Sequence, residues 1–388
     1  MLSARSTSSG RLHVAVVLGT RPEAIKLAPV LRALEASPLF SPVLINTGQH
    51  REMLEQMLRR LGLTVAHDLA VMRERQQLSA LTARLVGGLG ELIREERPDL
   101  VMVQGDTSST LCGALAAFYE HVAVAHVEAG LRSGVIDDPF PEELNRRLVT
   151  RMARWHFAPT PRAAAALTAE AVPGPQVMVT GNTVIDNLLW ARHRADGRSA
   201  FRTGRRGLLV TLHRRENQGA TMRALADTLL RLAERPDVEV LVPLHKSPAV
   251  RDVLLPPLGG NPRITLTEPL DYFDFIATMA DCSLVLTDSG GVQEEAPSFD
   301  KPVLVLRDTT ERPEVVRAGA ARLVGTDPAA VHAAATALLD DPVLYGRMAG
   351  ARNPFGDGHA SERILGTLAH DFGRVPAPAR SLDVVAAG

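Results

Sequence analysis

Short apolar runs alternate with longer segments of helical period along almost the whole chain. In the longer segments the apolar residues return at helical spacing, as Leu27, Leu31 and Leu34 do. Uninterrupted apolar runs are typical of strands that are buried on both faces of a parallel sheet, and the intervening helices then cover those faces. The pattern therefore predicts an α/β protein built from doubly wound parallel sheets.

The predicted strands fall into two series of comparable size, which indicates two Rossmann-like domains with a crossing near Gly181–Asn182. We expect one domain at 1–181, joined by a C-terminal helix at about 360–374, a second at 182–359, and a loose tail at 375–388. Open α/β sheets bind ligands beyond the carboxyl ends of their strands, so the expected site is the cleft between the domains. The expected strands are His13–Leu18, Val43–Thr47, Leu100–Gln104, Val122–Val127, Trp155–Ala158 and Gln176–Thr180, then Leu208–Leu212, Val238–Pro243, Ile264–Leu266, Leu284–Thr287, Val303–Leu306 and Arg322–Val324.

Composition excludes several classes of partner. Lys and Arg number 43 against 44 Asp and Glu, for a net charge of −1, so no global field favours nucleic acid. No apolar run approaches the roughly 20 residues of a membrane-spanning helix. The first eleven residues lack the apolar core of a secretory signal. Cys112 and Cys282 have no metal-ligand spacing, which fits a reducing compartment. We therefore expect a cytoplasmic protein without nucleic-acid or membrane partners.

Polar residues follow the predicted strands of the first domain. Arg21 and Lys26 follow the first strand at a helix start, where they are either an anion site or two solvated cations. Asp106 follows the third strand and is either a functional acid or an N-cap. Glu128 ends an apolar run, where a buried salt bridge is the competing explanation. Glu142 opens a helix, where acids are ordinary dipole partners. The three carboxylates together suggest convergence on one cleft.

The second domain repeats this arrangement. His213 leaves a strand and is followed by two arginines, which favours a functional role over a structural one. Ser289, Gly290 and Gly291 join a strand to a helix, where small residues let a phosphate approach the backbone N–H groups. The competing explanation is a tight turn that needs glycine for its backbone. Arg312 lies in another polar loop after an apolar strand.

Several common motifs are missing. The chain contains no G-x-G-x-x-G after its first strand, no G-x-x-x-x-G-K-[ST], no H-E-x-x-H and no paired C-x-x-C. These absences argue against tight dinucleotide binding and against a P-loop NTPase. We predict neither a metal ion nor a cofactor.

In order and spacing, the segments resemble the bacterial non-hydrolysing UDP-N-acetylglucosamine 2-epimerases from about residue 13 to 370. The motifs that carry the resemblance are GTRPEAIKLAPV, TGQHREML, VQGDTSST, HVEAGLRSG, PFPEELNRRL, GNTVID, HRREN, TDSGGVQEEAP and RDTTERPE. The resemblance implies the glycosyltransferase type B fold and reversible epimerisation at carbon 2, by elimination of UDP to a 2-acetamidoglucal and re-addition. It also implies a homodimer.

The resemblance also assigns roles to residues. The implied catalytic residues are Asp106, Glu128, Glu142 and His213. The implied substrate-binding residues are Arg21, Lys26, Phe275, Ser289, Gly290, Gly291, Glu295 and Arg312, with the serine and the two glycines at the diphosphate and Glu295 at the ribose. Activated members of the family bind a second substrate molecule as allosteric effector, and the matching residues are Gln49, His50, Arg75, Gln76, Arg214 and His245.

Two positions depart from the family pattern. Ser247 stands where an Asn is usual, and Val135–Asp138 replaces a segment that commonly holds an aromatic residue and a Ser. Both lie near sugar or effector contacts in the family, so a modified UDP-sugar is an alternative substrate. The sequence is also compatible with a hydrolysing 2-epimerase that releases free sugar and UDP, with a type B glycosyltransferase, and with a catalytically silent nucleotide-sugar sensor.

Overall fold

The computed structural model describes residues 10–48, 51–73, 76–194, 197–202 and 204–376. The chain falls into two compact units. The first contains the described residues up to Asn187 together with those from Gly356 onward, and the second is Leu188–Phe355. The boundary between them therefore lies inside helix α7 (Thr183–Arg192).

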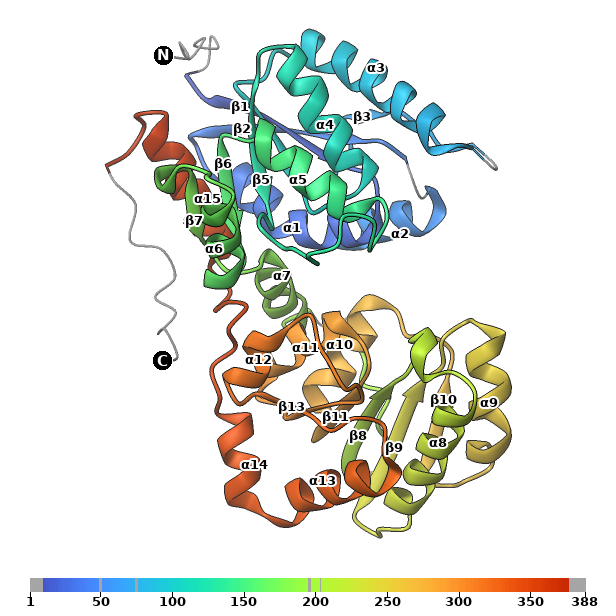
Figure 1. Ribbon diagram of the computed structural model, residues 1–388. Helices are drawn as coiled ribbons and strands as arrows, with labels where there is room; N and C mark the ends of the chain where they lie inside the picture. Colours follow the sequence, from blue (N-terminus) through green and yellow to red (C-terminus); the bar gives the residue numbers. More distant parts are fainter. Residues whose placement is uncertain (1–9, 49–50, 74–75, 195–196, 203, 377–388) are drawn as a thin grey trace. The chain divides into compact units, whose positions relative to one another are not determined.

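The first unit is built on a seven-stranded sheet in the order β3-β2-β1-β4-β5-β6-β7, and all pairs are parallel. Apolar side chains of β1 and β4, such as Val17 and Val103, pack in one buried cluster with those of α3 and α4. Figure 1 shows α3, α4 and α5 along this unit. Its strands are β1 (Leu12–Leu18), β2 (Phe40–Asn46), β3 (His67–Asp68), β4 (Leu100–Gln104), β5 (Ala123–Val127), β6 (Trp155–Ala158) and β7 (Val177–Val179). Its helices are α1 (Arg21–Ala36), α2 (Arg51–Leu61), α3 (Leu78–Glu96), α4 (Ser108–Tyr119), α5 (Glu142–Met152), α6 (Pro161–Ala169) and α15 (Ala360–Asp371).

The second unit holds a six-stranded parallel sheet in the order β10-β9-β8-β11-β12-β13. Leucines and valines of β8 and β9 form its core with α8, α9 and α13. Its strands are β8 (Arg206–Thr211), β9 (Val238–Pro243), β10 (Ile264–Thr267), β11 (Leu284–Thr287), β12 (Val303–Val305) and β13 (Ala321–Leu323). Its helices are α8 (Ala220–Ala233), α9 (Pro248–Leu258), α10 (Tyr272–Asp281), α11 (Gly290–Glu295), α12 (Pro313–Arg317), α13 (Pro328–Asp340) and α14 (Pro342–Ala349).

The last helix, α15, returns to the first unit and packs against α1 (Figure 1). Two contacts fix it there. The buried Asp186 accepts hydrogen bonds from the backbone N–H groups of Ala360 and Ser361, at 3.2 and 2.7 Å. At the other end, the Trp155 indole donates to Asp371 at 2.6 Å. Helix α15 therefore belongs to the first compact unit.

The expected fold class is confirmed, and the second series of six strands is found as predicted. In the first sheet the prediction missed β3, because its two residues, His67 and Asp68, are polar and too few to show a period. Four strands have the expected limits, and the limits of the others differ by at most three residues, which is close to the usual uncertainty of element ends. Of the expected tail, residues 377–388 lie outside the described part of the chain.

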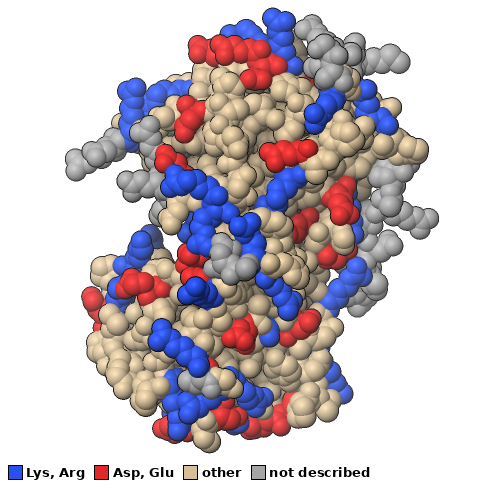
Figure 2. Space-filling model, turned by 180° about the vertical axis from the view of Figure 1, so that it is seen from behind, with Lys and Arg blue, Asp and Glu red and all other residues tan. Residues whose placement is uncertain are grey.

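Among the described residues, no helix is both long enough and apolar enough to cross a membrane. Figure 2 shows one face of the molecule, on which basic and acidic side chains are interspersed. Many charged side chains of the described residues are paired at short range, as Arg363 and Asp357 are at 2.7 Å.

Candidate active site

Loops leave both sheets at the point where the strand order reverses, between β1 and β4 in the first sheet and between β8 and β11 in the second. The helices after the two central strands run to opposite sides there, so the loops separate and leave a crevice for a ligand. The loop before α1, the loop after β4, His213 and Ser289 all lie at these reversals. The structure thus places the predicted polar loops where the fold favours binding.

Glu128 follows β5 in the left-handed backbone region, with φ of +64°, and is 8% exposed. Lys26 donates to both of its carboxylate oxygens, at 2.6 and 2.7 Å. The side-chain amide of Gln104 donates to one oxygen, and that of Asn182 to the other at 3.0 Å. A buried carboxylate needs such partners, because an unpaired charge there is costly. The ion pair considered from the sequence is present, and it involves Lys26, another candidate site residue.

Asp106 follows β4 and is held by α5. Arg146 donates to its carboxylate at 2.8 Å, and the Asn145 amide donates to its backbone carbonyl at 2.8 Å. Burial raises the pKa of the Asp106 carboxyl above its ordinary value, Arg146 opposes this rise, and the charge on Glu128 adds to it. The N-cap of α4 is Thr107, so the capping role considered for Asp106 is not observed.

Two neighbouring acids open α5, and they have different surroundings. Glu142 is partly exposed, and no hydrogen bond or ion pair joins its carboxylate to the described residues. Glu143 is fully buried, accepts from the backbone N–H of Ser133 at 3.0 Å, and pairs with Arg146 and Arg147 at 2.7 and 3.0 Å. Burial acts to raise the pKa of Glu143, but these partners hold it below its usual value. Glu143 therefore holds the start of α5 in place. The carboxylate of Glu142 is available to contact a ligand.

Glu23 joins the two loops at the first reversal. It completes a capping box with Thr20 and accepts from the backbone N–H groups of Gly19 and Thr20, at 2.9 and 2.8 Å. Its other oxygen accepts from the hydroxyls of Thr107 and Thr110, at 2.6 and 3.0 Å. Burial raises the pKa of Glu23, and the Thr107 bond opposes the rise. This carboxylate fixes the start of α1, where Arg21 lies, relative to the loop that carries Asp106.

In the second unit, the loop after β8 carries His213. Its ring Nδ1 lies 3.1 Å from a carboxylate oxygen of Asp288, which is fully buried. The imidazole of His245 stacks beside it, with ring centroids 5.8 Å apart. Arg214, the next residue, lies 3.6 Å from Glu311. Two of the expected effector residues, Arg214 and His245, thus lie next to the expected catalytic histidine.

Asp288 and Ser289 connect β11 to α11, and Gly290 and Gly291 are the first two residues of that helix. A Cβ at Gly290 would lie 2.9 Å from a terminal nitrogen of Arg312, so the guanidinium packs closely over this glycine. Arg312 is held by Glu294 at 2.7 Å. A Cβ at Gly291 would lie 4.0 Å from a carboxylate oxygen of Glu295. The expected diphosphate and ribose residues are therefore neighbours, and Phe275 is partly buried on α10.

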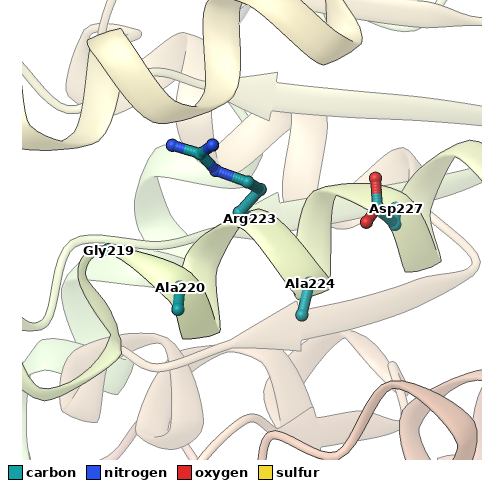
Figure 3. A pocket seen from close by; sticks show the side chains of 5 residues that line it. All are labelled: Gly219, Ala220, Arg223, Ala224 and Asp227. Carbon is teal, nitrogen blue, oxygen red and sulfur yellow. The ribbon is translucent and has the colours of Figure 1, made fainter.

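Three of the expected effector residues, Gln49, His50 and Arg75, lie outside the described residues. Gln76 is described and bonds to Arg84 and to the Met72 sulfur. A surface pocket of about 400 Å³ lies along α8 (Figure 3). No expected site residue lines it, so it has no part in the candidate site. Its lining residues are Gly219, Ala220, Arg223, Ala224 and Asp227.

Several residues that shape the site were not singled out from the sequence. Glu23 was detectable, because Thr20 and Glu23 have the T-x-x-E spacing of a capping box at a helix start. Gln104, Asn182 and Asp288 carried no local signal, since their importance comes from contacts with distant residues. In the described part of the chain, no group of three or more His, Cys, Asp or Glu residues is arranged to hold a metal ion.

Two Rossmann-like units with parallel sheets and polar loops at both strand reversals define the class of fold, the two-domain α/β arrangement of the type B glycosyltransferases. The family model described as UDP-N-acetylglucosamine 2-epimerase matches residues 32–369. The chain belongs to this family.

Individual proteins similar to this chain support its membership of the family. The UDP-N-acetylglucosamine 2-epimerase of Bacillus subtilis is 46% identical over 368 residues, which cover 94% of this chain and 96% of the relative. That of Escherichia coli K12 is 43% identical over 369 residues, 92% of this chain and 98% of the relative. The crystal structure of the Neisseria meningitidis enzyme bound to UDP-GlcNAc has a TM-score of 0.81 and 40% identity, and covers 92% of this chain and 100% of that one.

Proposed function

We propose that this chain inverts carbon 2 of UDP-N-acetylglucosamine to give UDP-N-acetylmannosamine, reversibly and without hydrolysis. Membership of the family supports the reaction class. The observation that carries the proposal is the group of ionisable residues at the first strand reversal, where Lys26 pairs with Glu128 and the charge of Glu128 acts on Asp106. Carboxylates in unlike surroundings can act as acid and base at one pH.

The carbon-2 hydrogen of the sugar has no adjacent carbonyl and is barely acidic, so direct removal is unfavourable. In the proposed route the anomeric C–O bond breaks, and its electron pair leaves with UDP. A carboxylate takes the carbon-2 proton, and a double bond forms between carbons 1 and 2 to give the 2-acetamidoglucal. Protonation of carbon 2 from the opposite face and attack of UDP on carbon 1 complete the inversion. No water is consumed.

The proposal assigns proton transfer to Asp106, Glu128, Glu142 and His213. The raised pKa of Asp106 favours a carboxyl that exchanges protons nearer to neutral pH than an ordinary aspartate does. The Lys26 ammonium donates to both carboxylate oxygens of Glu128 and holds that carboxylate in one orientation. Each well-placed acid or base of this kind contributes roughly 10²–10⁴ in rate.

The second unit would bind the nucleotide. Ser289, Gly290 and Gly291 would contact the diphosphate, with Arg312 packed over Gly290 and Arg21 as a further cation. Glu295 would bind the ribose, and Phe275 would contribute a further contact. Cations at the diphosphate stabilise the charge that develops as UDP leaves. The proposal requires residues of both units to act on one substrate molecule.

Regulation and assembly also belong to the proposal. A second UDP-N-acetylglucosamine would bind as effector through Gln76, Arg214 and His245, together with Gln49, His50 and Arg75. A second copy of the chain would pack on the exposed apolar side chains of α4 and α5, which are Phe118, Tyr119, Leu144 and Leu148. The proposed location is the cytoplasm, where the two buried cysteines stay reduced.

The test is incubation with UDP-N-acetylglucosamine in deuterated water, without any acceptor, followed by proton NMR. We expect deuterium at carbon 2 and a growing manno product that stays attached to UDP. Free N-acetylmannosamine would instead indicate a hydrolysing enzyme. Absence of carbon-2 exchange, with turnover only after an acceptor is added, would indicate a glycosyltransferase. Raising the substrate concentration in the same assay shows whether the rate responds to an effector.

Variants refine this test. Asp106→Asn removes a proton-transfer group while keeping the size of the side chain, so we expect kcat to fall by roughly 10²–10⁴ with little change in UDP affinity. Glu142→Gln should behave in the same way. Asp327→Asn is the matched control, because Asp327 caps α13 and Asn is an equally good N-cap. Near-normal exchange in both active-site variants would contradict the assignment of these residues.

A further inference from the structure

Asp288 directly follows the buried strand β11 and has no exposed surface. Four groups lie within hydrogen-bond distance of its carboxylate, and all come from the loop after β8. The backbone N–H groups of His213 and Arg214 lie 3.0 and 2.9 Å from one oxygen, and the Asn217 amide lies 3.2 Å from the same oxygen. The ring Nδ1 of His213 lies 3.1 Å from the other. One buried carboxylate therefore fixes both the backbone and the imidazole of this loop.

The donor set decides the charge of Asp288. Backbone N–H groups and an amide NH₂ can only donate, so they favour the ionised carboxylate. Burial acts to raise the pKa of Asp288, but the bonds from His213 and Arg214 prevail and hold it below its usual value. An ionised carboxylate has no proton to give. The proton on the line between Asp288 and His213 therefore belongs to Nδ1 of the ring.

The rest of the surroundings keep the imidazole in place. The His245 ring stacks on it at an interplanar angle of 26°. Asn217 donates to the backbone carbonyl of Leu306 at 3.2 Å as well as to Asp288, so the loop after β8 is also tied to the end of β12. The next residue after Asp288 is Ser289, the first residue of the expected diphosphate turn. The short segment Asp288–Ser289 thus carries both the carboxylate that contacts His213 and the start of the expected diphosphate turn.

We propose that Asp288 is a positioning residue that holds His213 as the Nδ1–H tautomer and leaves Nε2 as the ring atom that exchanges protons. The inference rests on the proposed function, in which His213 takes part in the reaction. A neutral imidazole has one donor and one acceptor nitrogen, and the partner of one nitrogen sets the role of the other. Asp288 touches neither substrate nor reacting atoms in this proposal and acts only through His213.

The first test is ¹⁵N NMR of the histidine rings in the wild-type protein, at a pH where His213 is neutral. His213 is one of 12 histidines, and its resonances are those missing from His213→Gln. We expect its Nδ1 to be protonated and its Nε2 to be unprotonated. The Nε2–H tautomer in the wild-type protein would overturn the inference. This measurement needs neither activity nor a folded Asp288 variant.

The second test is Asp288→Asn. The amide oxygen can still accept from the backbone of the loop, while the NH₂ group faces Nδ1 as a donor and favours the opposite tautomer. We expect His213, and no other histidine, to change its tautomer. We also expect kcat to fall by roughly 10²–10⁴ at nearly constant KM. Asp186→Asn is the control, because Asp186 is a buried carboxylate that accepts two backbone N–H groups and has no hydrogen bond or ion pair with a histidine in the described part of the chain. An unchanged tautomer in Asp288→Asn would overturn the inference.

A double variant separates positioning from an independent role. If Asp288 acts through His213, then Asp288→Asn adds nothing to the loss of kcat in His213→Gln. Multiplicative losses would show that Asp288 acts by another route. If the wild-type protein does not exchange the carbon-2 hydrogen, the proposed function fails, and the NMR spectra still decide the tautomer. The failures of the two proposals are therefore distinguishable.

Discussion

Lys26→Met is the sharpest probe of the first unit, because it leaves a carboxylate buried without its cation. The Lys26 ammonium contacts both oxygens of Glu128, whose side chain is 6% exposed. Removing one partner of a buried ion pair typically costs 3–5 kcal/mol, because the remaining charge is uncompensated. Lys26 is 23% exposed, and the amides of Gln104 and Asn182 remain, so we expect about 3 kcal/mol, the lower end of that range.

Tryptophan fluorescence can report this loss of stability in the first unit. It has two tryptophans, with Trp155 in the first unit and Trp190 in the second. In a Trp190→Phe background, Trp155 fluorescence follows the unfolding of the first unit in urea. The free energy of unfolding of that unit should fall by about 3 kcal/mol in Lys26→Met. Lys246→Met, at an exposed position, is the matched control and should change it by no more than about 0.5 kcal/mol.

The second step of the test removes the buried charge of Glu128 as well. Glu128→Gln in the Lys26→Met background removes the unpaired charge and keeps most of the side-chain volume, so it should recover most of the lost stability. If Lys26→Met lies within about 0.5 kcal/mol of the parent, or if the double variant is no more stable than the single one, then the reasoning about the buried charge is wrong. Activity does not enter this test, since both residues belong to the proposed site.

Two further predictions concern the thiols and acid stability. Burial raises the pKa of both cysteine thiols, Cys112 and Cys282, to about 12, so Ellman's reagent should label neither in the native protein and both after unfolding in urea. The bond from Arg363 lowers the pKa of Asp357 to about 2 from an ordinary value of 3.8, against the opposing effect of burial. A depressed folded-state pKa gives stability that is present above about pH 4 and is lost as the pH falls toward 2. The stability difference between wild type and Asp357→Asn should therefore shrink between pH 5 and pH 3 in urea titrations, and a constant difference would contradict the role of this pair.

Much of the candidate site could be located from the sequence, because its residues follow strands. Asp106, Glu128, His213 and Ser289 each come at or just after the end of a buried apolar run, and parallel strands bring such ends to one edge of a sheet. Their partners could not be located in this way. Glu128 contacts Lys26 across 102 positions of sequence, and no local pattern encodes that pairing.

The same limit applies to the acids of α5. From the sequence, Glu142 and Glu143 are equivalent members of a first helical turn. In the structure Glu143 is fully buried among Arg146, Arg147 and the Ser133 amide, while Glu142 is partly exposed. Which of two adjacent residues points inward depends on how the helix packs, and packing is decided by the whole unit.

The alternation of strands and helices, the two sheets and the positions of the polar loops can be derived from the sequence, because hydrophobic periodicity and turn residues act over a few neighbouring positions. The strand order, the short strand β3 and the long-range contacts by which the buried carboxylates of Glu23 and Asp288 join loops depend on the tertiary structure. These features depend on residues far apart in the chain that meet only when the sheets form. The energy of a buried charge is set by the partners it meets there.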